Sequence, residues 1–101
     1  MELKVDEIYT FKLSSGEELV AKLIDNTNPN SFIISNPVSI GPGPQGGLGL
    51  VPSLFTYNQH ENVRLNTNTV ALIAPTDESV RTKYIEATTG LKVPDKKVIL
   101  G

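Results

Sequence analysis

The sequence predicts a mainly β protein: a strongly bent, five-stranded antiparallel sheet forming a small open barrel, followed by a C-terminal helix. Between Leu13 and Asn36, apolar runs alternate with a Gly turn and an Asn/Pro loop, which is typical of consecutive antiparallel strands. A second apolar run, Val70–Ala74, ends abruptly at Pro75. After Pro75 the spacing of apolar residues changes from a period of two to a helical period.

The first strands are predicted by strict alternation. Ile8–Leu13 places its aromatic residues on one face and its polar residues on the other, as in a half-buried strand. Gly16 supplies a backbone that tolerates positive φ, so we expect a hairpin turn at residues 14–17. Leu19, Ala21 and Leu23 resume the alternation in the next strand.

The middle of the chain, residues 41–61, is a long excursion rich in Pro and Gly. Within it, residues 47–55 indicate a strand weakened by glycine, whose Pro52 belongs at a sheet edge or a bulge. Beyond it we expect a closing hairpin, in which Val63–Leu65 pairs with Val70–Ala74.

The region after Pro75 predicts a helix over residues 76–90. Thr76 or Asp77 is suited to cap it, and Gly90 is a stop signal. The chain is therefore expected to be one domain, with the sheet in residues 1–75 and residues 91–101 as a tail forming an extra strand or a disordered end.

Composition limits the function classes. The 101 residues carry a net charge of −2, and the nine Lys and Arg residues are scattered, so a broad surface that tracks phosphates is not expected. There is no cysteine to form disulfides or thiolate metal sites. No apolar run approaches the roughly 20 residues needed to cross a bilayer, and we expect a cytoplasmic protein with no membrane partner.

No constellation of residues indicates catalysis. His60 is the single histidine and lies in a polar run, so we expect a solvated loop residue and neither a metal site nor a catalytic triad. The carboxylate pairs Glu17–Glu18 and Asp77–Glu78 are most simply a solvated turn and a complement to the helix dipole. We expect no enzyme activity and no cofactor.

The aromatic residues Phe55 and Tyr57 are a better functional candidate. Their spacing would place both rings on the same face of a strand within the excursion. Exposed rings there can stack nucleic-acid bases, or they can form a contact with another subunit or a lid. The lack of neighbouring basic residues favours the contact.

These features resemble the Sm-like family, and most closely the small Sm-like proteins of marine phage and metagenomic origin. The resemblance spans Ile8 to Pro75. The family's first motif combines a Gly turn, a strand, a polar loop and an apolar strand; the residues that suit it are Gly16, Leu23, Phe32, Ile34 and Asn36. Its second motif is occupied by Leu65-Asn66-Thr67, followed by Val70 and Ile73.

The departures fall at the positions that bind RNA in the family. Counting from Leu23, Asn28 replaces the loop Asp and Asn30 replaces the stacking residue, while Asn66 replaces the Arg of the second motif. The resemblance thus implies an RNA site made of amides, at Asn28, Asn30, Asn66 and Asn68, without the stacking ring and the guanidinium. The family helix usually precedes the sheet, so a helix after the sheet implies a permuted cap.

The resemblance also implies a homo-oligomeric ring, in which the last strands of one subunit pair with the next. Apolar strands such as Val70–Ala74 would be hazardous as open edges, and symmetric pairing would remove those edges. Two functions stay open from the sequence. One is a ring that binds short single-stranded RNA at its pore; the other is a scaffolding or assembly module that has lost the RNA site and uses Phe55 and Tyr57 for protein contacts.

Overall fold

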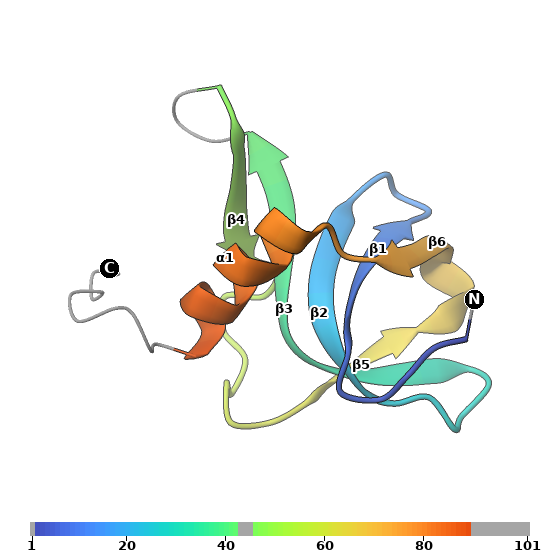
Figure 1. The fold of residues 1–101 in the computed structure, drawn as a ribbon. Coiled ribbons are helices and arrows are strands. Elements are labelled where there is room, and N and C mark those ends of the chain that lie inside the picture. Colours follow the sequence, from blue (N-terminus) through green and yellow to red (C-terminus); the bar gives the residue numbers. More distant parts are fainter. Residues whose placement is uncertain (1, 43–45, 90–101) are drawn as a thin grey trace.

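The computed structural model describes residues 2–42 and 46–89, which form one antiparallel sheet and one helix (Figure 1). The sheet follows the order β4-β3-β2-β1-β6, and β5 pairs with β3 beside this path. In chain order, the elements are β1 (Ile8–Leu13), β2 (Glu18–Asp25), β3 (Ser31–Pro42), β4 (Leu48–Pro52), β5 (Val63–Asn66), a 3-10 turn η1 (Thr67–Thr69), β6 (Val70–Pro75) and α1 (Glu78–Thr89).

The bent antiparallel sheet with a C-terminal helix is confirmed, and the sheet has six strands rather than five because β3 is long enough to pair with two partners. The residues Ser31–Ile34 pair with β5, whereas 38–42 pair with β4 on the same side. On the other side, the register between β2 and β3 shifts twice. Such bulges bend a strand, which is how one sheet curls without closing.

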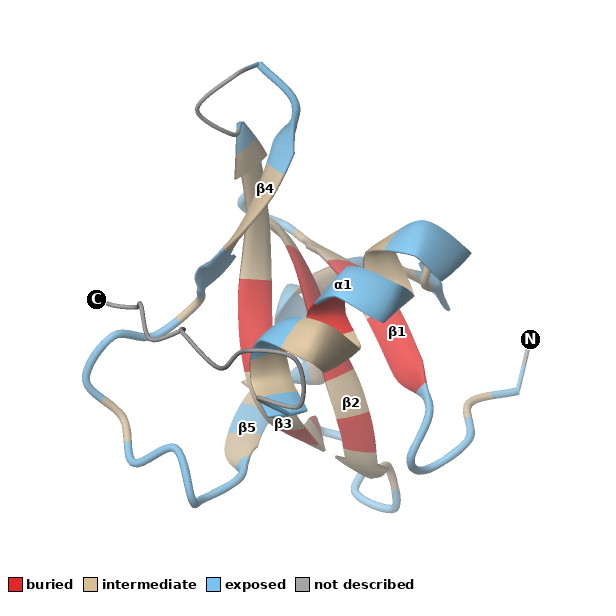
Figure 2. Ribbon diagram, turned by 60° about the vertical axis from the view of Figure 1, so that its left-hand side comes forward, coloured by how far each residue is buried: buried red, intermediate tan, exposed pale blue. Residues whose placement is uncertain are grey.

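Each face of the sheet carries its own core. The buried residues lie in β1, β2, β3 and α1 (Figure 2). The inner core consists of Tyr9, Phe11, Leu19, Ala21, Leu23 and Ile34. Half-buried residues of β5 and β6 also pack on it, so this face is the inside of the curl. The helix-side core consists of Ile8, Val20, Val38 and Tyr84. The alternation predicted for Leu19, Ala21 and Leu23 is thereby confirmed, with Val20 on the opposite face.

The helix α1 is held to the sheet through Tyr84. Asp77 caps α1 as predicted, because its Oδ2 accepts the backbone N–H groups of Ser79 and Val80 at 3.1 and 3.3 Å. The Tyr84 hydroxyl accepts the N–H of Lys22 at 3.2 Å and donates to the carbonyl of Ser35 at 2.9 Å. Lys22 and Ser35 are partners across the β2–β3 bulge, so the hydroxyl bridges the ladder where its register shifts.

The prediction that Val63–Leu65 and Val70–Ala74 pair as a closing hairpin is wrong. β5 pairs with the start of β3, and β6 pairs with β1, because the 3-10 turn Thr67–Thr69 separates the two strands and directs them to different neighbours. The strand predicted over residues 47–55 of the excursion is present in shorter form as β4, which ends at Pro52. It pairs with the end of β3, which continues to Pro42. We call residues 38–42 and 48–52 the β3–β4 arm, which projects from the rest of the sheet (Figure 1).

The predicted tail, residues 91–101, and the stop residue Gly90 lie outside the described residues. Within residues 2–42 and 46–89, no helix has the length and apolar character needed to pass through a bilayer.

Candidate functional site

The structure brings the two asparagine-rich loops together at one end of the sheet. The loop 26–30 connects β2 to β3, and η1 follows β5, the strand that pairs with the start of β3. The Thr67 backbone N–H donates to the Asn30 carbonyl at 3.0 Å. The Thr67 hydroxyl donates to the Pro29 carbonyl, also at 3.0 Å. We call Asn28, Asn30, Asn66 and Asn68 the Asn cluster.

The loop 26–30 is shaped by two successive Asx turns. The Asp25 Oδ1 accepts the Thr27 N–H at 2.9 Å, and the Asn28 Oδ1 accepts the Asn30 N–H at 2.7 Å. Short polar side chains form such turns because they reach the backbone two residues ahead. The backbone N–H and hydroxyl of Thr27 lower the pKa of the Asp25 carboxyl by stabilising its charged form. The loop is therefore fixed by its own residues.

The η1 side of the cluster is held to the β1–β2 turn. The Thr69 carbonyl accepts the Ser14 backbone N–H at 2.7 Å and its hydroxyl at 3.2 Å. The Thr69 hydroxyl donates to the Asn66 carbonyl at 2.8 Å. Three turns from distant parts of the sequence are thus joined at this end of the sheet.

The amides of the cluster are available to a ligand. All four side chains are exposed. The Asn28 Oδ1 is used within its own turn, whereas the side-chain amides of Asn30, Asn66 and Asn68 make no hydrogen bond to the described residues. Each amide offers both donors and an acceptor, which is the combination that base edges require.

Arg64 was missed by the sequence comparison with the family motif. Because side chains alternate along a strand, Arg64 lies on the same face of β5 as Asn66, two residues away and roughly 7 Å along the strand. It is exposed and has no ion-pair partner among the described residues. The alternation of apolar and polar residues in β5 could have predicted this from the sequence. It places the Arg64 guanidinium beside the Asn cluster, at a different position from the arginine of the family motif.

The prediction that Phe55 and Tyr57 lie on one face of a strand is wrong. β4 ends at Pro52, so both residues lie in the loop 53–62. Phe55 is 84% exposed, while Tyr57 is half-buried and lines a cavity together with Ala87 and Thr88 of α1. The prediction failed because Pro52 cannot continue a hydrogen-bonded ladder, and it ends the strand before the aromatic residues.

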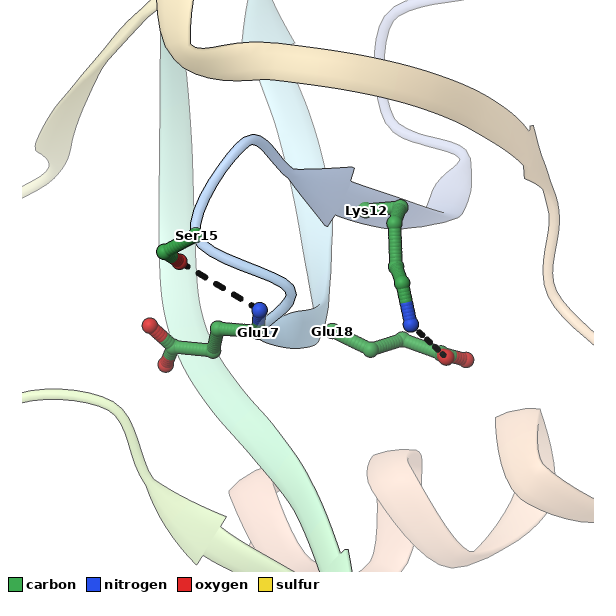
Figure 3. A network of polar contacts seen from close by, with 4 residues as sticks. All are labelled: Lys12, Ser15, Glu17 and Glu18. Atoms are coloured by element: carbon green, nitrogen blue, oxygen red, sulfur yellow. Dashed lines mark hydrogen bonds and ion pairs between the residues drawn. The ribbon is translucent and has the colours of Figure 1, made fainter.

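The carboxylate pairs have structural partners. Glu17 and Glu18 extend away from each other (Figure 3); Glu18 forms an ion pair with Lys12 at 3.8 Å, and Glu17 accepts a hydrogen bond from the Ser39 hydroxyl. The Glu17 backbone N–H donates to the Ser15 hydroxyl at 3.3 Å. His60 lies exposed in the loop 53–62. Within the described residues, no three potential metal ligands come together.

Both ends of the sheet present strand edges with exposed apolar side chains. β4 carries Leu48, which is 78% exposed, and Val51, which is 49% exposed. β6 carries Leu72, which is 67% exposed. Neither strand has a second neighbour among the described residues.

Compared with models of known protein families and with curated protein sequences, the chain matches none.

Proposed function

We propose that the protein is a non-catalytic, cytoplasmic Sm-like subunit that assembles into a homo-oligomeric ring and binds short single-stranded RNA through the Asn cluster. The observation that carries the proposal is the joining of loop 26–30 to η1 through Thr67. The two segments that supply the RNA site in the resembling family are distant in the sequence, and here they form one exposed surface.

The chemistry of the cluster favours RNA bases over a long phosphate backbone. The protein carries a net charge of −2, so non-specific attraction to phosphates is weak. Amides recognise base edges through paired donors and acceptors, and unstacked bases of single strands expose those edges. Arg64 supplies one cation beside Asn66 for a phosphate or for stacking on a base.

The RNA site is tested by fluorescence anisotropy with labelled oligo-U and oligo-A at low salt. Asn66→Ala removes an exposed amide whose side chain makes no hydrogen bond within residues 2–42 and 46–89, so folding should be unaffected and affinity should fall. Asn62→Ala is the matched control, because Asn62 is also exposed, makes no side-chain hydrogen bond to any residue that the structure describes, and lies beyond the other end of β5. Equal, negligible anisotropy changes with both oligonucleotides would refute RNA binding.

The ring is supported by the edges of β4 and β6, which have no second partner strand in the part of the chain that the structure describes. Unpaired strand edges with exposed apolar residues are aggregation hazards in a monomer, and closed symmetric pairing removes them. If β4 of one copy pairs with β6 of the next, Leu48, Val51 and Leu72 gain neighbours on the adjoining strand and lose part of their exposure.

Sedimentation equilibrium at micromolar concentration tests the assembly. Leu72→Lys and Val51→Lys should each shift the protein towards monomer, because a charge without a partner would be partly desolvated at the interface. Thr56→Lys adds the same charge in the loop 53–62 and should leave the assembly unchanged. A wild-type protein that is only monomeric under these conditions would contradict the ring.

A second candidate is a scaffolding module that has kept the fold and lost the RNA ligand. The exposure of Phe55, at 84%, favours it, because a large ring is left in solvent at a loop tip. Phe55→Ser then abolishes binding to a protein partner but leaves the oligonucleotide titration unaltered. RNA binding that depends on Asn66 would exclude this as the sole function.

A further inference from the structure

Two neighbouring cavities lie under the C-terminal half of α1, away from the Asn cluster. One, of about 150 Å³, lies between α1, the middle of β3 and the loop 53–62. The other, of about 280 Å³, lies between α1 and the strands β1 to β3. Asn36 and Thr88 line both, so the two cavities share a wall. Their combined volume lies in the lower part of the range for small-molecule pockets, about 300–1,000 Å³.

The larger cavity holds unpaired cationic groups. Lys22 and Arg81 line it, and both are half-buried. The one ion pair among the described residues joins Lys12 to Glu18, so neither cation is neutralised by a carboxylate within 4.0 Å. Asp6 also lines the cavity, from an exposed turn. Two partly desolvated cations at one cavity are suited to a phosphate, since a guanidinium and an ammonium both donate to its oxygens.

The smaller cavity has the groups that hold a planar base. The half-buried Tyr57 lines it together with Asn36 and Gln59, whose side chains carry amides. Neither amide forms a side-chain hydrogen bond with the described residues. A tyrosine ring provides a stacking surface, and an amide can satisfy the donors and acceptors of a base edge.

Asn36 is held in an unusual backbone conformation at the shared wall. Its φ is +50°, in the left-handed region, which a non-Gly residue adopts at a cost. The strain occurs in the part of β3 that neither β4 nor β5 covers, between the residues paired with each. Backbone strain of this kind recurs at ligand sites, because it directs a side chain where a regular strand would not.

We propose that these two cavities form a single site for a ribonucleoside monophosphate, with the base in the smaller cavity and the phosphate in the larger one. Tyr57 stacks on the base, and Asn36 and Gln59 bond its edge. Arg81 and Lys22 hold the phosphate, and Asp6 accepts from the sugar hydroxyls. The same chemistry fits a free nucleotide or the 5′-phosphorylated end of an RNA strand. The site does not depend on the Asn cluster or on ring assembly.

The test is a titration of the full chain with AMP and UMP, followed by calorimetry and by amide chemical shifts. We expect saturable binding below millimolar concentration, with shifts confined to α1, the loop 53–62 and the middle of β3. Arg81→Gln should weaken binding about tenfold or more, because it removes one charge-assisted hydrogen bond to the phosphate. Lys83→Gln, the same charge change two residues along α1 and outside both cavities, should change it less than twofold.

Further variants separate a nucleotide site from simple anion binding. Tyr57→Ala should abolish nucleotide binding, whereas Tyr57→Phe retains the stacking ring and should preserve it. Asn66→Ala should leave nucleotide binding unchanged, which keeps this site distinct from the RNA proposal. A 5′-phosphorylated oligo-A that binds more tightly than AMP, with the same dependence on Arg81, identifies an RNA end as the source; a weaker or equal affinity identifies the free nucleotide.

The proposal is overturned if neither nucleotide binds at millimolar concentration. It is also overturned if Arg81→Gln and Lys83→Gln weaken binding equally, or if inorganic phosphate binds as tightly as AMP and Tyr57→Ala has no effect.

Discussion

The β3–β4 arm and the inner core contain similar apolar residues but bury them very differently. In the inner core, Leu23 is fully buried, and half-buried residues of β5 and β6 pack against the cluster. In the arm, Leu48 and Val51 are largely exposed, although β3 and β4 pair in a regular register. Strand pairing alone therefore does not bury a strand; a second layer is needed.

The helix α1 supplies that layer over only part of the arm. Ile40 and Leu50 pack against the helix-side core, whereas Leu48 and Val51 face solvent. The comparison indicates that the inner core determines the stability of the fold, while the arm is available for association. Substitutions in the inner core should then lower the stability of the fold, whereas substitutions in the arm should mainly weaken association.

Leu23→Ala should have the largest effect on stability. Its side chain is fully buried among residues of three strands, so truncation removes buried apolar surface and leaves a cavity. We expect a loss of about 2–5 kcal/mol in the free energy of unfolding, measured by urea denaturation. The matched substitution Leu48→Ala in the arm should cost less than about 0.5 kcal/mol in the monomer. Equal losses would show that the arm is packed.

Tyr84→Phe should have an intermediate effect at the junction of the two regions. Removing the hydroxyl leaves the Lys22 N–H and the Ser35 carbonyl without their bridge at the bulge. We expect a loss of about 1–3 kcal/mol, the cost of unsatisfied buried groups, in the same denaturation experiment. Tyr57→Phe is the control, because the Tyr57 hydroxyl makes no hydrogen bond to the described residues. An unchanged stability of Tyr84→Phe would mean that water replaces the bridge.

The same tyrosine predicts a pH dependence. Burial raises the pKa of Tyr84 to about 12, because the charged phenolate is poorly solvated there. In the unfolded chain the pKa of this tyrosine is about 10. The contribution of Tyr84 to the free energy of unfolding is therefore fully present below pH ~10 and is lost as the pH rises towards 12. Denaturation of wild type and Tyr84→Phe across this range should show their difference in stability shrinking with pH. A constant difference would contradict the raised pKa.

The local rules of the sequence predict the strands and the helix cap well, and they fail where the partner of a strand matters. Alternation correctly assigned the faces of β2, and Asp77 was one of two residues, with Thr76, that the sequence predicted as the helix cap. The pairing of β5 with β3 was missed because nearby strands in the sequence are expected to pair with each other. Only the geometry of η1 decides that they do not.

The sequence singled out each residue of the Asn cluster, but it did not predict that the two loops carrying them contact each other. The sequence supplied asparagines in two separate loops, while their contact depends on hydrogen bonds from Thr67 to the backbone of the other loop. Arg64 was not predicted as a site residue, because the Arg position of the family motif falls on Asn66. The cavities under α1 could not be anticipated, since they depend on how the loop 53–62 returns to the helix.

The smallest effect on the isolated subunit is expected from Leu48→Ser, and it gives the sharpest test of the comparison. Leu48 is 78% exposed, so at low protein concentration the variant and wild type should unfold within about 0.5 kcal/mol of each other. If the arm binds a second copy, wild type alone should become more stable as its concentration rises, because association stabilises the folded state by mass action. Thermal denaturation over a hundredfold range of concentration measures this divergence. Parallel curves for the two proteins would leave the arm without a role in self-association, since a buried Leu48 could not be replaced by serine without loss of affinity.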